Sequence, residues 1–140
     1  MAGTRWVLRV TAALGLAVQG VVHWRLAPGL DTLVGSGSPR ITMGELFRVE
    51  AVIALVALLL LIGFGTTWTA ALAALVAAGG LAAVLLYAFV TVGAVGPLPN
   101  MDDPTWPAEK LLSAVAEGVA ALAALGYLAA IRRQLAARTG

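Results

Sequence analysis

Residues 51–64 read AVIALVALLLLIGF, a run without one charged or hydrogen-bonding side chain. A helix needs about 20 mostly apolar residues to cross roughly 30 Å of hydrocarbon, and the run reaches that length when it begins near residue 45. Three further segments, 6–26, 68–95 and 106–131, are similarly long and apolar. The sequence therefore predicts an all-α integral membrane protein, with four membrane-spanning helices in one domain covering residues 1–140.

The overall composition agrees with this prediction. Hydrophobic residues make up 61% of the chain and charged residues 11%, whereas a soluble domain is usually about half apolar and about a quarter charged. The chain has no cysteine, which excludes thiolate catalysis and cysteine-ligated metals. The arginines form no solvated stripe, so nucleic acid is not an expected partner. The bias toward Arg, Ala, Val and Gly is typical of a high-GC bacterium, which suggests a bacterial cytoplasmic (inner) membrane.

The connections between the predicted helices favour an up-down-up-down four-helix bundle. Thr42-Met43-Gly44-Glu45 matches a capping box, which marks the start of the second helix. The short uncharged turn at residues 65–67 forces the second and third helices into an antiparallel hairpin. Pro107 suits the first turn of the fourth helix, because its missing N–H would have no partner there. The abundant small residues allow the helices to approach closely.

Basic residues predict the orientation of this bundle. Arg5 and Arg9 flank the first helix, and further arginines follow the fourth, at 132, 133 and 138. Short cytoplasmic segments of membrane proteins carry an excess of Lys and Arg, so we expect both termini to be cytoplasmic. Arg5 and Arg9 also resemble the start of a signal peptide, but no clear small-x-small cleavage site follows, and we interpret the segment as a retained helix.

Several polar residues interrupt the apolar helices. Thr11, Gly15, Gln19 and His23 recur every four residues and lie on one stripe of the first helix. Polar groups are costly in hydrocarbon, so the stripe is expected to face the other helices. Given the topology, polar residues of all four helices should meet in the outer-leaflet half of the bundle. The predicted ligand-binding residues are Gln19, His23, Arg48, Glu50, Tyr87, Lys110 and Glu117.

Each of these residues also has a structural interpretation. His23 can hydrogen-bond at the membrane interface, Arg48 can pair with Glu45 one turn away, and Lys110 can extend to the headgroups. The Gly79-Gly80 pair fits a packing notch. Two carboxylates are harder to explain, because a buried one must pair or hold a proton. A structural salt bridge and a functional site both remain open for Glu50 and Glu117.

The sequence carries no motif of a metal site or a catalytic centre. One histidine cannot form a haem pair, and a His with two Glu could hold iron or manganese, yet the repeated Glu-x-x-His of known bundle sites is absent. Asp102 and Asp103 offer too few ligands for a calcium cage. No nucleophile motif, phosphate loop or dinucleotide fingerprint occurs. We therefore predict no metal ligand and no catalytic residue, and no motif implies a cofactor.

Short motifs along nearly the whole chain resemble the DoxX-like four-helix membrane proteins and, more closely, a set of small bacterial membrane proteins. The motifs that carry the resemblance are Gly20-x-x-His23, Phe47-Arg48-Val49-Glu50, Gly63, Leu86-Tyr87, Gly96-Pro97-Leu98-Pro99, Trp106-Pro107, Glu109-Lys110, Ser113 and Ala116-Glu117. The DoxX-like family includes a subunit associated with quinone-linked sulfur oxidation. The resemblance thus implies a redox-associated or quinone-proximal accessory protein, with no catalytic residue to carry over.

Three classes of function are compatible with these residues. We favour a non-enzymatic accessory protein whose outer polar pocket binds a quinone, a lipid headgroup or another membrane subunit. A second class is a proton-coupled transporter acting as a homodimer, with Glu117 exchanging the proton. The apolar inner half of the helices argues against that class. A third class is a membrane enzyme of lipid or quinone chemistry that uses Glu50, Glu117 and His23 as acid and base.

Overall fold

The computed structural model describes residues 2–139, and these residues are almost entirely helical. The long helices are α1 (Ala2–Leu26), α2 (Met43–Phe64), α3 (Thr67–Phe89) and α4 (Ala108–Thr139), and a 3-10 turn, η1 (Ala27–Leu30), follows α1. Each of the four long helices is long and apolar enough to cross a membrane. The prediction of an all-helical chain with four potential membrane spans is confirmed.

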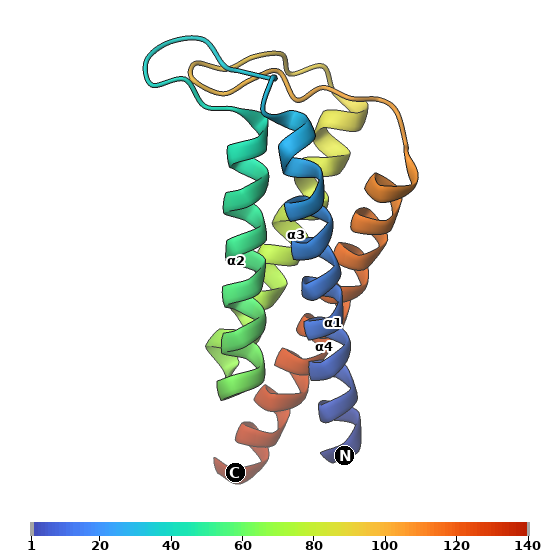
Figure 1. Cartoon of the computed structure of the whole chain (residues 1–140). Coiled ribbons are helices and arrows are strands. Elements are labelled where there is room, and N and C mark those ends of the chain that lie inside the picture. The colour runs from blue at the N-terminus through green and yellow to red at the C-terminus, as the bar shows by residue number, and fades with distance from the viewer. Residues whose placement is uncertain (1, 140) are drawn as a thin grey trace.

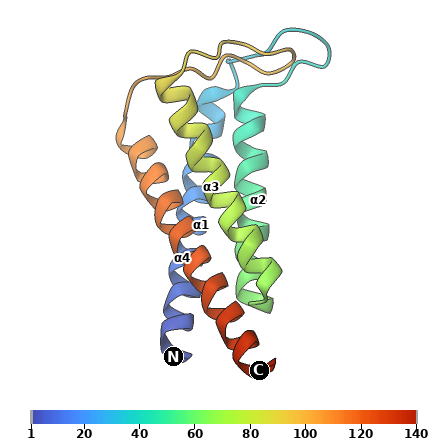
Figure 2. The same ribbon diagram turned by 180° about the vertical axis from the view of Figure 1, so that it is seen from behind.

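The four helices pack side by side (Figure 1). α1 lies against α2 and α4, and α3 lies against the same two helices from the other side of the bundle (Figure 2). The two chain ends lie at one end of the molecule, whereas segments 27–42 and 90–107 lie together at the other end (Figure 1). At the terminal end Arg5 of α1 hydrogen-bonds Gln134 of α4.

Small side chains fill the interior of the bundle. Its most buried positions are mainly alanines, and Leu16 and Leu61 are the large apolar side chains that are fully buried. Gly15 of α1 lies so close to α4 that an added Cβ would stand 2.7 Å from the Ala116 carbonyl oxygen. The largest apolar residues point outward instead, and Leu75 and Leu122 are more than 70% exposed. This inverted pattern suits a lipid environment, because acyl chains are as apolar as leucine.

The turn between α2 and α3 is held by side chains of the other two helices. Gly65 closes α2 in the left-handed region at φ 58°, which glycine adopts without steric cost. Arg9 of α1 donates hydrogen bonds to the Leu61 and Ile62 carbonyls at the end of α2. The Tyr127 hydroxyl of α4 donates to the Gly65 carbonyl at 2.8 Å. Arg9 thus satisfies the Ile62 carbonyl at the end of the helix and adds a second donor to the Leu61 carbonyl, which also accepts the Gly65 N–H.

The opposite end of the bundle is covered by the two long connections. The capping box predicted before α2 is present, since the Thr42 hydroxyl accepts from the Glu45 N–H and the Glu45 carboxylate accepts from the Thr42 N–H. Gly35 packs directly on the Pro97 backbone, where a Cβ would overlap the Pro97 carbonyl. The two connections therefore pack against each other.

The helix boundaries differ from the predicted ones in two places. α3 ends at Phe89 instead of near residue 95, because the chain turns extended at Val90 and the Asp102 carboxylate accepts the Val92 and Gly93 N–H groups at 3.0 and 2.7 Å. α4 begins at Ala108 and continues to Thr139, beyond the predicted end at 131. The last turns of α4 are polar and basic, so the apolar run in the sequence does not extend into them.

Candidate functional site

A cavity of about 360 Å³ lies at the end of the bundle that the two connections cover. All four long helices, η1 and the second connection contribute to its wall. Most of the wall is apolar and comes from residues such as Val22, Leu26, Leu30, Met43, Leu46, Phe47, Ala83, Val84 and Met101. Its polar side chains are His23, Glu50, Tyr87, Asp103, Glu109, Lys110 and Ser113.

A buried polar cluster adjoins this cavity toward the middle of the bundle. The His23 Nε2 atom lies 3.3 Å from Oε2 of Glu50, and Gln19 Nε2 donates to Oε1 of the same carboxylate at 3.0 Å. Ser113 donates to Oε1 of Glu117 at 3.0 Å. Gln19 and Glu117 are fully buried and His23 is 5% exposed. Gln19, His23 and Glu50 thus form one hydrogen-bonded group between α1 and α2, and the Ser113–Glu117 pair of α4 lies beside it, with one ligand atom each of His23, Glu50 and Glu117 within 4.8 Å of one another.

Two oxygens of this cluster have no hydrogen-bond partner. They are Oε1 of Gln19 and Oε2 of Glu117. An unsatisfied buried acceptor costs about 1–3 kcal/mol, and more where it carries charge. Buried polar groups in native proteins are nearly always paired. Among the described residues of the bundle interior, the Gln19 amide and the Glu117 carboxylate thus each keep one unsatisfied acceptor.

The hydrogen bond of His23 shows which nitrogen of its ring carries a proton. Its Nδ1 atom lies 2.9 Å from the Gln19 backbone carbonyl, which only accepts hydrogen bonds, so Nδ1 carries a proton. The Nε2 atom is then the one that faces the Glu50 carboxylate. The Phe47 ring packs on the imidazole with ring centres 4.7 Å apart and helps to fix its orientation.

Gly80 is the contribution of α3 to the cluster. A Cβ at this position would lie 2.5 Å from Gln19 Nε2, 2.8 Å from Glu50 Oε1 and 3.1 Å from Glu117 Cδ. The neighbouring Gly79 faces away, and a Cβ there would meet no atom within 4 Å. The predicted packing notch therefore applies to Gly80, where the space is taken by polar side chains and not by another helix backbone.

Lys110, Tyr87 and Asp103 stand at the outer part of the cavity. Lys110 pairs with the Asp103 carboxylate at 3.4 Å and also donates to the Asp103 carbonyl. Its ammonium lies 5.1 Å from the centre of the Trp106 ring. Hydrogen bonding from Thr105, with a smaller contribution from Lys110, lowers the pKa of Asp103. The Tyr87 carbonyl accepts the Asp103 N–H at 2.9 Å, which ties α3 to the same corner.

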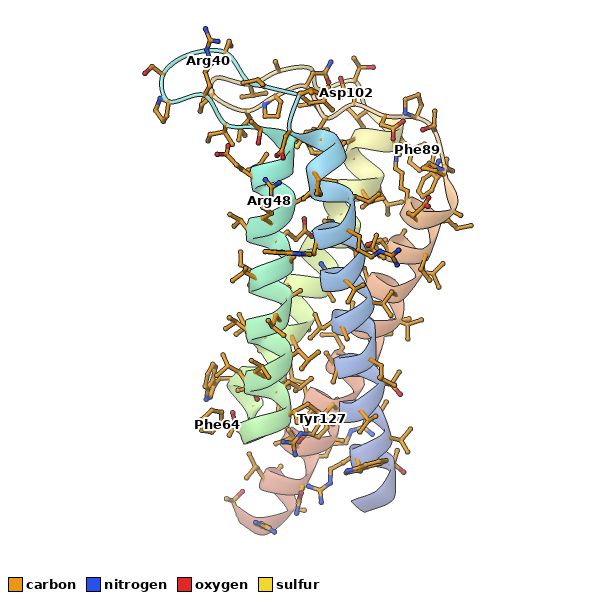
Figure 3. The ribbon with its side chains drawn as sticks, viewed as in Figure 1. Arg40, Arg48, Phe64, Phe89, Asp102 and Tyr127 are labelled. Carbon is orange, nitrogen blue, oxygen red and sulfur yellow. The ribbon has the colours of Figure 1, made fainter. Side chains whose placement is uncertain are left out.

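Arg48 lies outside this site, although the sequence placed it in the cluster. Its guanidinium forms two hydrogen bonds to the Asp31 carboxylate, at 2.8 and 2.7 Å. The hydrogen bond from Arg48 is the main reason that the pKa of Asp31 is lowered. Figure 3 shows Arg48 on the loop-side half of α2. Glu50, two residues further on, points to the opposite side of the helix, as the 100° step per residue requires.

Of the seven predicted residues, the structure therefore brings Gln19, His23 and Glu50 into direct contact and places Glu117 beside them. Tyr87 and Lys110 line the cavity without joining that cluster, and Arg48 is separate. Gly80 and Asp31 were not among the predicted site residues. Gly80 contributes only the absence of a side chain, which the sequence does not distinguish from any other glycine. The Asp31–Arg48 pair joins a connection to a helix, and the sequence does not show that these two segments lie close together.

The geometry can bind a molecule that is polar at one end and apolar elsewhere. Its polar end would meet the His23 imidazole and the Glu50 carboxylate, and its apolar part would meet the aliphatic wall. Comparison of the chain with protein-family models, with curated proteins and with solved structures found no match.

Proposed function

We propose that the chain is a multi-pass protein of the bacterial cytoplasmic membrane that binds a small amphipathic molecule in the cavity between its four helices. A membrane quinone or a lipid fits this description. The protein would act as an accessory or ligand-binding protein and not as an enzyme. The resemblance to DoxX-like proteins is part of this proposal, since that family includes a quinone-linked subunit.

The observation that carries the proposal is the pairing of an apolar cavity with a polar floor. Ligand sites typically have volumes of about 300–1,000 Å³, mostly apolar walls and a few placed polar groups. The cavity, of about 360 Å³, has these features, with His23 and Glu50 as the placed groups. A quinone carbonyl or a lipid headgroup would hydrogen-bond there, while Lys110 and Tyr87 would stand at the outer part.

The proposed membrane placement is an up-down-up-down bundle with both termini in the cytoplasm. The arginines at 5 and 9 belong to the first turns of α1, and those at 132, 133 and 138 belong to the last turns of α4. Both chain ends lie at the same end of the molecule (Figure 1). The acidic residues lie in the two connections or in the halves of α2 and α4 that adjoin them. This distribution supports a cytoplasmic terminal end under the positive-inside bias. The cavity would then open in the outer leaflet half.

The experiment is native mass spectrometry of the protein released from nanodiscs made with bacterial lipid extract. Ala83 lines the cavity, and its neighbour Ala82 is exposed and does not. Ala83→Phe should therefore fill the cavity, and Ala82→Phe is the matched control of the same size on the same helix. We expect a bound lipid or quinone mass on the wild type and on Ala82→Phe, and its loss from Ala83→Phe. A wild-type protein without any bound mass, or equal retention by both variants, would contradict the proposal.

A further inference from the structure

At the inner end of the cavity, three side chains that can bind a metal ion lie close together: His23, Glu50 and Glu117. One ligand atom from each residue can be chosen so that all three lie within 4.8 Å of one another. The three residues come from α1, α2 and α4. We propose that this trio binds one divalent first-row transition-metal ion, of the manganese, iron or zinc class.

The first argument is the orientation of the histidine. The Nδ1 proton is committed to the Gln19 carbonyl, so in the neutral ring Nε2 presents its lone pair to the Glu50 carboxylate 3.3 Å away. A lone pair and a carboxylate repel each other unless a proton or a cation lies between them. Metal-bound histidines characteristically donate their other ring N–H to a carbonyl or carboxylate, which fixes the ring and makes it a better ligand. Gln19 supplies that second contact.

The second argument is the unpartnered oxygen of Glu117. This carboxylate is fully buried, its Oε1 is held by Ser113, and its Oε2 has no partner. A cation shared with Glu50 would satisfy Oε2 and relieve the repulsion between the buried Glu117 carboxylate and the partly buried Glu50 carboxylate at once. The Gln19 side-chain oxygen, also unpartnered, is a further neutral oxygen beside the trio.

The distances between the three ligand atoms allow them to bind one ion after small side-chain rotations. Ligand atoms about 2.1 Å from one metal ion stand about 3.0–3.5 Å apart. The present separations reach up to 4.8 Å, so rotations of the Glu side chains would be needed and no helix would have to move far. Gly80 leaves this space free of any side chain from α3.

The donor set selects the class of metal. One imidazole and two carboxylates without a thiolate suit manganese, iron or zinc, and copper(I) prefers sulfur ligands. Calcium takes six to eight oxygen ligands, more than the trio offers. His23 and Glu50 line the cavity, so an open coordination position would face it and could accept an oxygen of the cavity ligand. The ion itself needs only the three side chains, and this inference therefore goes beyond the proposed ligand binding.

The test uses untagged full-length protein in detergent micelles, titrated with Co²⁺ as a spectroscopic probe and with Zn²⁺ as competitor. His23 is the single histidine of the chain, so the ring signals in a histidine-labelled NMR spectrum report on this site alone. We expect one Co²⁺ per chain, displaced by Zn²⁺, and in the diamagnetic Zn²⁺ form a larger change of the His23 Nε2 resonance than of the Nδ1 resonance. Absence of saturable binding, or binding without a change at His23, would overturn the proposal.

The matched variants are Glu117→Gln, at a buried ligand of the trio, and Glu45→Gln, at an exposed position outside the cavity wall. Gln at position 45 can still complete the capping box of α2. We expect Glu117→Gln to weaken Co²⁺ binding at least 100-fold and Glu45→Gln to leave it within about twofold, in line with the 10–100-fold cost of losing even an outer-sphere partner. Glu50→Gln serves as a second ligand variant should Glu117→Gln fail to fold. Equal affinity in the buried and exposed variants refutes the site.

The two proposals can fail separately. Ala83→Phe should lose the organic molecule of the cavity and keep Co²⁺ binding, since Ala83 is no ligand. Glu117→Gln should lose the ion. If the protein retains the organic molecule but binds no metal, the metal site is refuted and the proposed ligand binding stands. If the protein binds metal but no organic molecule, the proposed ligand binding is refuted and the metal site stands.

Discussion

Replacement of Gly80 by alanine is the most direct perturbation of the polar cluster, and Gly79 is its internal control. Both glycines lie in the same turn of α3, but only Gly80 faces the cluster. Gly80→Ala would place a methyl group 2.5 Å from Gln19 Nε2 and 2.8 Å from Glu50 Oε1. Gly79→Ala would place the same group where no atom lies within 4 Å.

The expected loss of stability depends on which atoms must shift to accommodate the added methyl group. The contacted atoms are side-chain ends, but they are joined by the 3.0 Å hydrogen bond between Gln19 and Glu50, and Glu117 Cδ blocks the third direction at 3.1 Å. Overpacking of this kind costs about 1–3 kcal/mol. Alanine also gains up to about 1 kcal/mol over glycine in a helix, and this gain is common to both variants. Gly80→Ala should therefore be less stable than Gly79→Ala by about 1–3 kcal/mol.

The assay is reversible unfolding of each variant in mixed micelles as the fraction of denaturing detergent rises, followed by circular dichroism. The His23 ring resonances supply a local readout, because Gly80→Ala should disturb the Gln19–Glu50–His23 contacts and Gly79→Ala should not. Equal stabilities for the two variants, with an unchanged His23 spectrum in both, would refute the claim that α3 is shaped around the buried polar group.

Three further predictions concern other contacts. Tyr127→Phe removes the hydrogen bond to the Gly65 carbonyl and should lower the free energy of unfolding by about 0.5–1.5 kcal/mol in the same assay; no loss would mean that water or lipid replaces the bond without cost. The hydrogen bond from Arg48 lowers the pKa of Asp31 in the folded state. The Asp31–Arg48 pair therefore stabilises the fold fully at pH values above the usual Asp pKa of about 3.9, and this stabilisation is lost as the pH falls through the lower pKa of the folded state. The melting temperatures of wild type and Asp31→Asn should therefore differ at pH 7 and converge in acid, and a constant difference would exclude the pair as the cause. A fluorescent protein fused after residue 140 should fluoresce and alkaline phosphatase fused after Asn100 should be active in bacteria, whereas the opposite pattern would reverse the proposed orientation.

The helices themselves could be predicted because their signals are local. The uncharged run at 51–64 and the Thr42–Glu45 capping box need no knowledge of the rest of the chain, and both belong to α2. The four-residue spacing of Gly15, Gln19 and His23 correctly placed these residues toward the other helices, since all three are buried. Local periodicity thus identifies which face of a helix is inside.

Features that depend on contacts distant in sequence could not be predicted in this way. α3 stops at Phe89 because the Asp102 carboxylate, on the second connection, binds the backbone just after it. Arg48 has Glu45 within reach on its own helix, and yet it pairs with Asp31 of the first connection. In both cases the competing partner comes from a loop, whose path a hydropathy pattern does not define.

The polar cluster shows why a site in a helical bundle can lack a sequence motif. Known di-metal bundles repeat Glu-x-x-His, so that one helix supplies two ligands and the spacing is visible. Here each of three helices supplies one ionisable residue, His23, Glu50 or Glu117, and the fourth supplies the missing side chain of Gly80. Such a set has no spacing to recognise. In the sequence such a site can be recognised only from its single residues, because a carboxylate or an imidazole inside an apolar helix is energetically costly and requires a partner. In this chain His23 and Glu50 are partners of each other and Glu117 is held by Ser113. The oxygen of Glu117 that remains unpaired marks the position where we expect the metal ion.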